Sequence, residues 1–216
     1  MHERGGLSAE SVPGRDNIRV HTKALGSIGI LDKGSGINLV LLHGWNAHSG
    51  TWSRISGLLT SRFRIIAPSF PPHFGSFEET PVKQYTDALE ELLSALDVTR
   101  AILTGHSLGG LIALNYLRRK PEVVGAIVLE DTAGFDAEDG LITSGMEYAD
   151  FISEKGVRTL IIWGEDDPII PACVGKSIHS AISGSSYFEL SGAGHVPHWR
   201  KPEAFANLLI RFVSSL

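Results

Sequence analysis

The five residues from Gly105 to Gly109, Gly-His-Ser-Leu-Gly, constrain the fold more than any other stretch of the chain. They follow an apolar, strand-like run at 101–103 and precede an apolar, helix-like run at 111–117. A serine at the apex of such a tight turn has an unfavourable backbone conformation, and small residues two positions away on each side avoid backbone clashes. The segment predicts a strand, a turn and a helix, with the Ser107 hydroxyl exposed at the turn. A glycine-rich loop that only begins a helix has the same local sequence, so the rest of the chain must supply the context.

The composition is typical of one globular domain. The chain has 216 residues, of which 43% are hydrophobic, enough for a sizeable core. A net charge of -5 and a pI of about 6.0 give no electrostatic reason to expect binding to nucleic acid or to an anionic membrane. No apolar run reaches the roughly 18 residues of a membrane span. The single cysteine, Cys173, excludes an intrachain disulfide, which fits a reducing compartment, and we expect a cytoplasmic location.

Residues 1–17 are rich in glycine and charge and lack the apolar centre of a signal peptide. We expect them to form a loose N-terminal leader, followed by a single domain over 18–216. Within this domain there is no internal repeat and no linker. The sequence leaves the oligomeric state open.

Short apolar runs alternate with helical patterns along this domain. The predicted strands span 18–24, 27–31, 37–42, 63–67, 100–104, 123–129, 159–163 and 186–190. The predicted helices span 52–59, 85–96, 111–117, 172–181 and the segment from Pro202 onward, with a short helix around 146–153. From residue 37 this alternation implies a mostly parallel sheet with helices on both faces, which is a three-layer α/β sandwich. With the two opening strands, 18–24 and 27–31, the expected sheet has eight strands.

Polar side chains that suit catalysis follow five of the predicted strands. These residues are His43, Ser107, Asp131, Asp167 and His195. In parallel sheets of this kind, ligands bind at the carboxyl ends of the strands, so we expect these residues to meet at one edge. A serine hydroxyl is a weak nucleophile that needs a nearby base, and the base needs a group that fixes its tautomer.

Four segments, in chain order, resemble the motifs of the α/β-hydrolase fold family. The resemblance extends from about residue 37 to the C-terminus and agrees with the alternation of strands and helices. The segments are His43-Gly44-Trp45, similar to the oxyanion loop; Gly105 to Gly110, similar to the nucleophile elbow; Gly164-Glu165-Asp166-Asp167 with Pro171, similar to the acid loop; and Gly192 to His195 with Pro202-Glu203, similar to the histidine loop.

The resemblance implies a role for individual residues. Ser107 corresponds to the nucleophile, His195 to the general base, and Asp167 to the acid that orients His195. The backbone N–H groups of Trp45 and Leu108 correspond to the oxyanion hole. Two other carboxylates compete with Asp167 for the orienting role: Asp166 is its neighbour in sequence, and Asp131 ends the preceding strand, where some relatives carry their acid.

The expected pocket is bordered by the oxyanion loop and by aromatic residues. Its predicted residues are His43, Gly44, Phe70, Phe74 and Phe135, with core packing as the alternative for the aromatic ones. We expect His43 to be a buried, hydrogen-bonded imidazole rather than a catalytic group. Only residues 133–157 are available where many relatives insert a helical lid, so we expect a vestigial lid and an open site.

The motifs together predict a serine hydrolase that cleaves small carboxylic esters through an acyl-enzyme. The fold also accommodates hydrolysis of thioesters, lactones and carbon–carbon bonds, and a non-catalytic ligand-binding or protein-interaction member is a further alternative. The histidines lack metal-ligand spacing, and no glycine-rich dinucleotide motif follows a strand, so we expect neither a metal nor a cofactor. The expected partner is a small-molecule ester.

Overall fold

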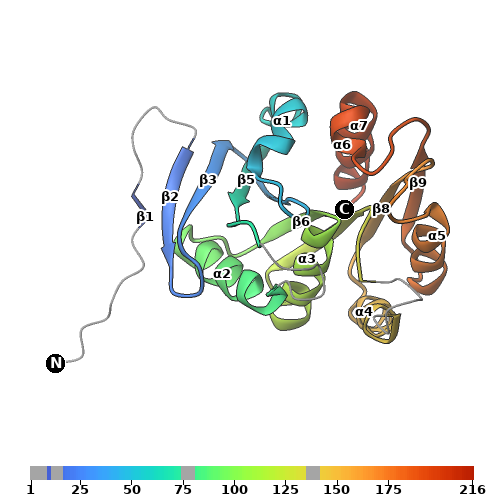
Figure 1. Ribbon diagram of the computed structural model, residues 1–216, viewed down its shortest axis with the longest axis horizontal. Helices are drawn as coiled ribbons and strands as arrows, with labels where there is room; N and C mark the ends of the chain where they lie inside the picture. Colours follow the sequence, from blue (N-terminus) through green and yellow to red (C-terminus); the bar gives the residue numbers. More distant parts are fainter. Residues whose placement is uncertain (1–8, 11–16, 74–80, 135–141) are drawn as a thin grey trace.

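The computed structural model describes residues 9–10, 17–73, 81–134 and 142–216. Over these residues the chain forms one sheet with the strand order β1-β2-β3-β5-β4-β6-β7-β8-β9 (Figure 1). Its strands are β1 (Ala9–Glu10), β2 (Asn17–Thr22), β3 (Gly26–Gly34), β4 (Ile37–Leu42), β5 (Phe63–Ser69), β6 (Ala101–His106), β7 (Val124–Glu130), β8 (Thr159–Gly164) and β9 (Ser186–Leu190). The pairings from β1 to β5 are antiparallel, and those from β5 to β9 are parallel.

The predicted α/β sandwich is confirmed, with one addition to its sheet. The eight expected strands are present as β2 to β9. The described residues contain a ninth strand, β1, which pairs with β2 so that Ala9 lies opposite Val20. This strand lies inside the segment 1–17, for which the sequence predicts a loose leader. Two residues are too few to show the alternating pattern of a strand, so the sequence carries no signal for β1.

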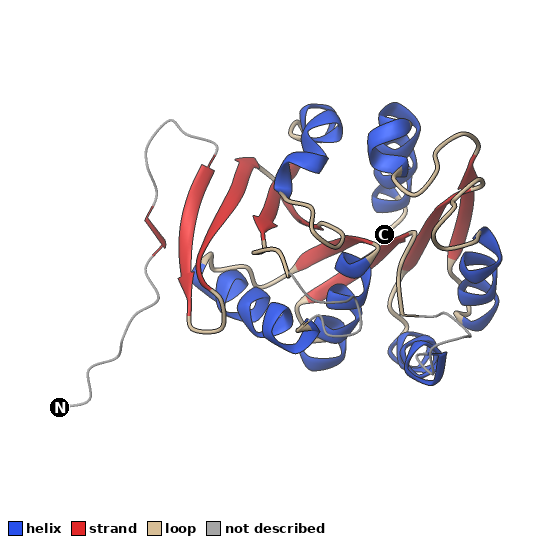
Figure 2. Cartoon of the chain, viewed as in Figure 1, coloured by secondary structure: helices blue, strands red, loops and turns tan. Residues whose placement is uncertain are grey.

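Helices cover both faces of this sheet (Figures 1 and 2). On one face lie η1 (Ser49–Trp52), α1 (Ser53–Leu59), α6 (Pro197–Arg200) and α7 (Pro202–Ser214), and on the other lie α2 (Val82–Ala95), α3 (Leu108–Arg119), α4 (Ile142–Lys155) and α5 (Ala172–Ala181). Successive residues of a strand point to opposite faces. In β4, Leu39 and Leu41 accordingly pack with α1 and α7, whereas Val40 and Leu42 pack with the residues of α2 and α3.

The segment 133–157 contains a longer helix than the sequence indicates. The sequence predicts a short helix around 146–153, and the structure has α4 over Ile142–Lys155. Its residues Tyr148, Ala149 and Ile152 are buried in the same cluster as α3 and α5, so α4 belongs to the helical layer of the sandwich. The four-residue α6 is absent from the predicted helices because a single turn shows no periodicity.

The strand order creates a crevice at the carboxyl ends of β4 and β6. The chain passes from β4 to β5 on one side, and the next strand, β6, pairs on the other side of β4. The connecting helices α1 and α2 lie on opposite faces of the sheet (Figure 1). Such a reversal of strand order separates the two connections and is the usual ligand-binding position in open α/β sheets.

Two glycines allow α3 to approach the sheet at this crevice. A Cβ atom on Gly105 would overlap the carbonyl oxygen of Gly109, and a Cβ atom on Gly109 would overlap the carbonyl oxygen of Leu42. Both clashes involve backbone atoms, which cannot move aside as a side chain can. The two glycines of the pentapeptide therefore permit the contact between β4, β6 and the first turn of α3.

This close contact predicts a large difference between two glycine-to-alanine substitutions. Gly109→Ala should lower the free energy of unfolding by about 1–3 kcal/mol, because overpacking forces the backbone apart. Gly57→Ala in α1 is the matched control, since its Cβ would meet no atom within 4 Å. Alanine favours a helix over glycine by up to about 1 kcal/mol, so the control should be as stable as the wild type or more so. Urea unfolding measures both changes, and equal stability of the two variants would contradict the close-approach argument.

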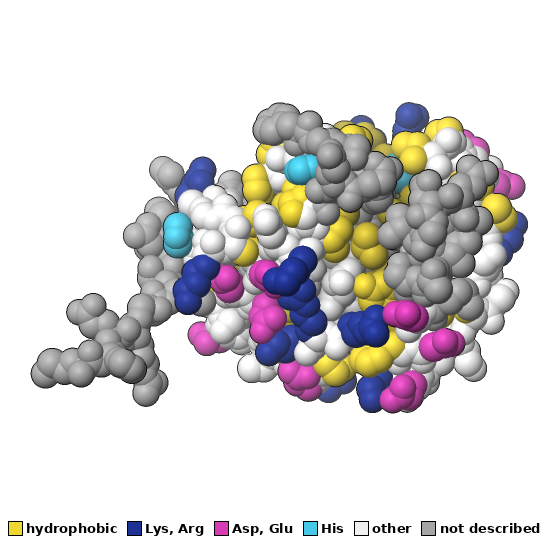
Figure 3. Space-filling model, turned by 60° about the horizontal axis from the view of Figure 1, so that its bottom comes forward, with side chains coloured by type: hydrophobic (Ala, Val, Ile, Leu, Met, Phe, Trp, Pro, Cys, Tyr) yellow, Lys and Arg dark blue, Asp and Glu magenta, His cyan; other side chains and the backbone are white. Residues whose placement is uncertain are grey.

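The surface over α2, α3 and α4 carries charges of both signs (Figure 3). Asp87 is bridged by Lys83 and Arg119, at 2.8 and 2.5 Å, and Lys120 pairs with Glu90 at 2.9 Å. Among the described residues of this face, positive and negative side chains are therefore interspersed. Among the described helices, none combines the length and the apolar character that crossing a bilayer requires.

Candidate active site

The turn between β6 and α3 holds Ser107 in a strained conformation. Its backbone angles are φ 50° and ψ -118°, a region that residues other than glycine rarely occupy. The Ser107 N–H donates a hydrogen bond to the carbonyl of Glu130 at 2.9 Å, and the Ser107 carbonyl accepts from the N–H of Gly110 at 3.0 Å. These bonds hold the turn on both sides. The strained serine predicted from the pentapeptide is thus present, at the carboxyl end of β6.

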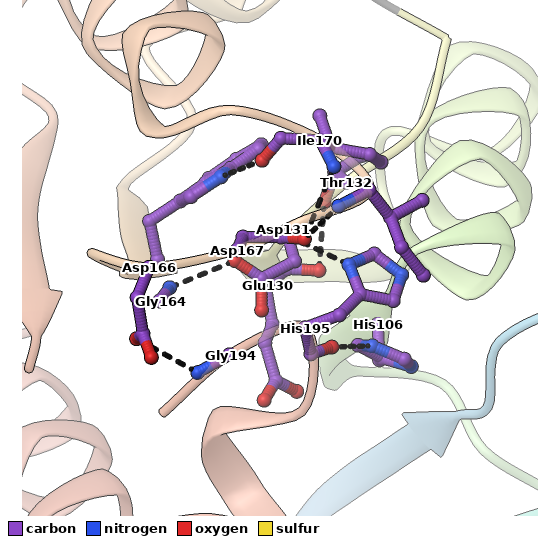
Figure 4. Close-up of polar contacts among 12 residues, drawn as sticks. His106, Glu130, Asp131, Thr132, Gly164, Asp166, Asp167, Ile170, Gly194 and His195 are labelled. Atoms are coloured by element: carbon purple, nitrogen blue, oxygen red, sulfur yellow. Dashed lines mark hydrogen bonds and ion pairs between the residues drawn. The ribbon is translucent and has the colours of Figure 1, made fainter. Parts of the chain in front are cut away.

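The loops after β8 and β9 bring a carboxylate and a histidine together. The Nδ1 atom of His195 lies 2.7 Å from Oδ2 of Asp167 (Figure 4). The other oxygen, Oδ1, accepts hydrogen bonds from the backbone N–H groups of Ile169 at 2.7 Å and Ile170 at 3.1 Å. Burial opposes the charge on this carboxyl, but the bonds from His195 and the two amides outweigh it and lower the pKa of Asp167. An ionised Asp167 therefore fixes the Nδ1–H tautomer and leaves Nε2 as a basic nitrogen.

Asp166 performs a different task from its neighbour. Its Oδ1 accepts a hydrogen bond from the N–H of Gly194 at 3.0 Å (Figure 4). That bond to Gly194 is the main cause of the lowered pKa of Asp166. The loops meet closely here, since a Cβ on Gly164 would overlap the Gly194 carbonyl oxygen. Asp166 thus ties the acid loop to the histidine loop through the backbone of Gly194 rather than through the His195 ring, in keeping with the turn-capping alternative to a catalytic role.

Asp131 is buried beside these loops and is neutral. Its Oδ1 accepts from the N–H of Gly164 at 2.9 Å, while its Oδ2 has no hydrogen-bond partner among the described residues. Burial first, and then the neighbouring charges of Glu130 and Asp167, raise the pKa of Asp131 to about 9. A protonated carboxyl offers no negative charge to a histidine. Of the three acids that the sequence leaves open, Asp167 is therefore the one that is both ionised and bonded to His195.

Two further histidines are structural. His106 donates from Nε2 to the carbonyl of His195 at 2.6 Å, and His43 accepts at Nε2 from the N–H of Phe70 at 3.0 Å. Burial lowers the pKa of each to about 4, so both imidazoles are neutral at neutral pH. His43 agrees with the expected buried imidazole. The contact of His106 with the histidine loop has no signal in the sequence, because it joins positions 89 residues apart.

A cavity of about 520 Å³ lies above Ser107 and His195. It is lined by Gly44, Trp45, Ala47, Thr51, His106, Ser107, Ala133, Ile169, Ile170, His195 and Val196. Ser107 and His195 share this wall, although the described residues contain no hydrogen bond between the two side chains; catalytic contacts are often longer before a substrate binds. A second cavity, of about 660 Å³, lies at the opposite ends of the strands near Ile37 and Arg158 and contains neither residue.

The predicted pocket residues divide into three groups. Gly44 lines the cavity above Ser107, as the oxyanion loop predicts. His43 and Phe70 are buried behind that wall and do not line it, since the Phe70 ring stacks on Tyr85 with centroids 5.4 Å apart. Phe74 and Phe135 lie outside the described residues. The sequence missed Thr51, Ile169 and Ile170, which carry no motif and reach the cavity only through the fold.

Three groups near the cavity lie close enough together to be considered as metal ligands. His106, Asp131 and His195 have ligand atoms within 4.8 Å of one another. One nitrogen of each ring already has a partner, since His106 Nε2 bonds to the His195 carbonyl and His195 Nδ1 bonds to Asp167. Asp131 is neutral, whereas a metal ligand must be deprotonated. The cluster fits a hydrogen-bonded network better than a metal site.

Comparisons with known proteins agree with this geometry. The family profile described as the alpha/beta hydrolase fold matches residues 37–150, which is more than half of the chain. The chain belongs to this family. A protein of Mycobacterium tuberculosis (strain ATCC 25618 / H37Rv) is 32% identical over 112 residues, covering 50% of this chain and 33% of that protein.

Two esterases are also similar to this chain. A pimeloyl-(acyl-carrier protein) methyl ester esterase of Chromobacterium violaceum is 36% identical over 100 residues, covering 46% of this chain and 39% of the esterase. The chain therefore matches less than half the length of these sequence relatives. The esterase RhEst1 from Rhodococcus sp. ECU1013 has a TM-score of 0.74 at 21% identity, covering 94% of this chain and 100% of that one. This likeness shows the shared fold.

The assignment of the acid in this α/β hydrolase is testable without any substrate. A proton shared between His195 Nδ1 and the Asp167 carboxylate should give a strongly downfield proton resonance, because the bond is short and charge-assisted. Asp167→Asn should remove this resonance or shift it upfield by several ppm. Asp131→Asn is the matched control and should retain it. If the signal were lost in Asp131→Asn but kept in Asp167→Asn, the partner of His195 would be Asp131, and the assignment to Asp167 would be wrong.

The buried neutral carboxyl predicts a pH-dependent stability. In the folded protein the pKa of Asp131 is about 9, against an ordinary value of 3.8. Between these pH values the folded state holds a proton that the unfolded state releases, so stability falls as pH rises. Asp131→Asn removes that cost and keeps the oxygen that accepts from Gly164. The variant should be more stable than the wild type by on the order of 1–3 kcal/mol at pH 7, with the gain vanishing near pH 4. Urea unfolding across pH 4–8 measures the difference, and a gain that is independent of pH would contradict it.

Proposed function

We propose that the protein is a serine hydrolase that cleaves small carboxylic esters through an acyl-enzyme. In this proposal Ser107 is the nucleophile, His195 the general base, and Asp167 the group that orients His195. The observation that carries it is the 2.7 Å bond between His195 Nδ1 and an ionised Asp167, next to a strained Ser107 on the same cavity wall. The Asp167 side chain is fully buried, and the His195 side chain is 14% exposed. Asp167 therefore binds the inner edge of the imidazole, and the rest of the ring lines the cavity.

In this proposal the reaction has two stages, acylation of Ser107 and hydrolysis of the acyl-enzyme, and His195 Nε2 carries the proton in both. His195 Nε2 takes the proton of the Ser107 hydroxyl while Oγ attacks the ester carbonyl, and then delivers it to the departing alkoxide. Water next attacks the acyl-enzyme, giving its proton to Nε2, and Ser107 leaves as the proton returns to Oγ. Asp167 stays ionised throughout and stabilises the imidazolium that forms in each half.

The backbone around Ser107 provides donors for the oxyanion. Leu108 begins α3, so its N–H belongs to the first helical turn, where N–H groups have no acceptor within the helix. The second donor in this proposal is the N–H of Trp45. A Cβ atom built on the preceding residue, Gly44, would lie 3.3 Å from Cβ of Ser107, so this loop passes directly over the nucleophile. A helix N-terminus and a backbone donor suit the negative charge of a tetrahedral intermediate.

The cavity wall favours small, uncharged esters. Apart from Ser107, Thr51 and the two histidines, the described lining residues are apolar or glycine. No aspartate, glutamate, lysine or arginine is among them. A volume of about 520 Å³ suits a short acyl group and a small alcohol. The similarity to a methyl ester esterase supports ester substrates over the thioesters, lactones and carbon–carbon bonds that the fold also accommodates. The cytoplasmic location stays a prediction.

A fluorophosphonate probe tests the nucleophile directly. Such a probe should label one residue, Ser107, and labelling should fall in His195→Ala because the hydroxyl loses its base. Turnover of p-nitrophenyl acetate and butyrate should fall by about 10³-fold or more in Ser107→Ala. Ser49→Ala is a control serine on η1, outside the cavity lining. A folded wild type that neither reacts with the probe nor exceeds hydroxide on either ester would favour a non-catalytic ligand-binding role.

A further inference from the structure

The loop after β4 closes into a tight turn beside the nucleophile. The N–H of Ala47 donates to the carbonyl of Gly44 at 3.2 Å, so Trp45 and Asn46 are the two central residues of a β-turn. Gly44, Trp45 and Ala47 line the cavity that contains Ser107, whereas Asn46 is not among its lining residues. Asn46 therefore belongs to the loop that borders the reaction without belonging to the cavity wall.

Asn46 has a left-handed backbone. Its φ is 51°, a value that asparagine tolerates better than most residues and that glycine adopts freely. A positive φ at this position of a turn is typical of glycine and asparagine for that reason. The side-chain oxygen of Asn46 accepts a hydrogen bond from the N–H of His73 at 3.2 Å, which ties the turn to the segment after β5. The conformation of Asn46 is thus a condition for the bond between Ala47 and Gly44.

The turn fixes the orientation of the peptide unit between Gly44 and Trp45. Nε2 of His43 accepts from the N–H of Phe70, and burial lowers the pKa of His43 to about 4, so the neutral ring carries its proton on Nδ1. This Nδ1–H donates to the Gly44 carbonyl at 2.8 Å, and the N–H of Ala47 is the second donor to the same oxygen. In a planar trans peptide the N–H points opposite to the C=O. Donors that hold the Gly44 carbonyl therefore also set the direction of the Trp45 N–H.

We propose that Asn46 is a positioning residue for the oxyanion hole, because its left-handed backbone closes the turn that directs the N–H of Trp45 at the developing oxyanion. The inference rests on the proposed function and adds to it a residue that acts on the reaction through the backbone. Asn46 touches neither the substrate nor Ser107 in this proposal. Its effect should appear where negative charge develops, in the transition state, and not in the binding of the ester.

A substitution series at Asn46 tests the role of the backbone conformation. The left-handed region is open to glycine, less favourable for alanine and least favourable for β-branched valine. In Asn46→Gly, kcat/KM for p-nitrophenyl acetate should stay within about 3-fold of the wild type. It should fall by about 10- to 100-fold in Asn46→Ala and further in Asn46→Val, approaching the loss of roughly 10²- to 10³-fold that follows removal of one oxyanion donor. An equal loss in Asn46→Gly and Asn46→Ala would overturn the proposal, since it would make the side-chain bond to His73 the cause.

A trifluoromethyl ketone separates positioning from general damage to the fold. Oγ of Ser107 adds to the ketone carbon of 1,1,1-trifluoro-2-hexanone, the hydroxyl proton passes to His195 Nε2, and the resulting alkoxide occupies the oxyanion hole. Across the series, the inhibition constant should rise by the factor by which kcat/KM falls. The dissociation constant of methyl butyrate, measured by NMR titration, should differ by less than 2-fold between Ser107→Ala and Ser107→Ala/Asn46→Ala. An inhibition constant that Asn46→Ala leaves unchanged would overturn the proposal.

Asp97 provides the matched control. It is exposed like Asn46, has a φ of 54°, and lies in the turn after α2, where its N–H donates to the carbonyl of Ser94 at 3.2 Å. Asp97→Ala imposes the same backbone cost far along the chain from the oxyanion loop. It should lower the midpoint of urea unfolding as Asn46→Ala does, but keep kcat/KM within about 2-fold of the wild type.

The outcomes distinguish this inference from the proposed function. If the wild type hydrolyses esters and the two alanine variants have equal kcat/KM, the inference fails and the proposed function stands. If the wild type neither hydrolyses an ester nor reacts with the fluorophosphonate, the proposed function fails, and the inference fails with it because no oxyanion forms. A loss in Asn46→Ala that Asn46→Gly restores and Asp97→Ala does not share supports both.

Discussion

The close contact between α3 and the strands β4 and β6 is the constraint on which the site depends. Gly105 and Gly109 remove the side chains that would separate them, and the strained Ser107 lies between the two glycines. The same contact places Leu108 at the helix N-terminus beside the oxyanion loop that follows β4. Strain at Ser107 is tolerated because its backbone bonds to Glu130 and Gly110 hold the turn in place. The close packing of α3 on the sheet and the strained position of Ser107 therefore depend on the same turn.

A second principle of the site is the separation of charge among buried titratable groups. Asp167 is ionised because it receives bonds from His195 and two backbone amides, whereas Asp131, a short distance away, is neutral because it lacks them. Glu130 is ionised because His198 faces it. His43 and His106 are neutral, and their bonds hold loops. The local hydrogen-bond donors, rather than the residue types, decide which acid carries the charge.

Much of the fold could be predicted because its signals are local. Strands such as β4 and β8 are continuous apolar runs, and α2 and α7 carry a regular helical period. The two-residue β1 and the single-turn α6 were out of reach because so few residues show no period. For the site, the motifs predict Ser107, Asp167 and His195, and the fold brings His195 beside Asp167 and onto one cavity wall with Ser107. The positions of His43 and Phe70 behind the cavity wall, rather than on it, follow from packing that no local pattern encodes.

The sequence by itself determined the order of strands and helices, the serine turn and the choice of polar residues at the strand ends, since each depends on neighbours in the chain. The tertiary structure decided which carboxylate meets His195, how His106 and Asp166 hold the histidine loop, and that His198 contacts both Glu130 and Thr51. These contacts join residues 28 to 147 positions apart. Their energetics depend on burial and on facing charges, which exist only once the sheet has brought the loops to one edge.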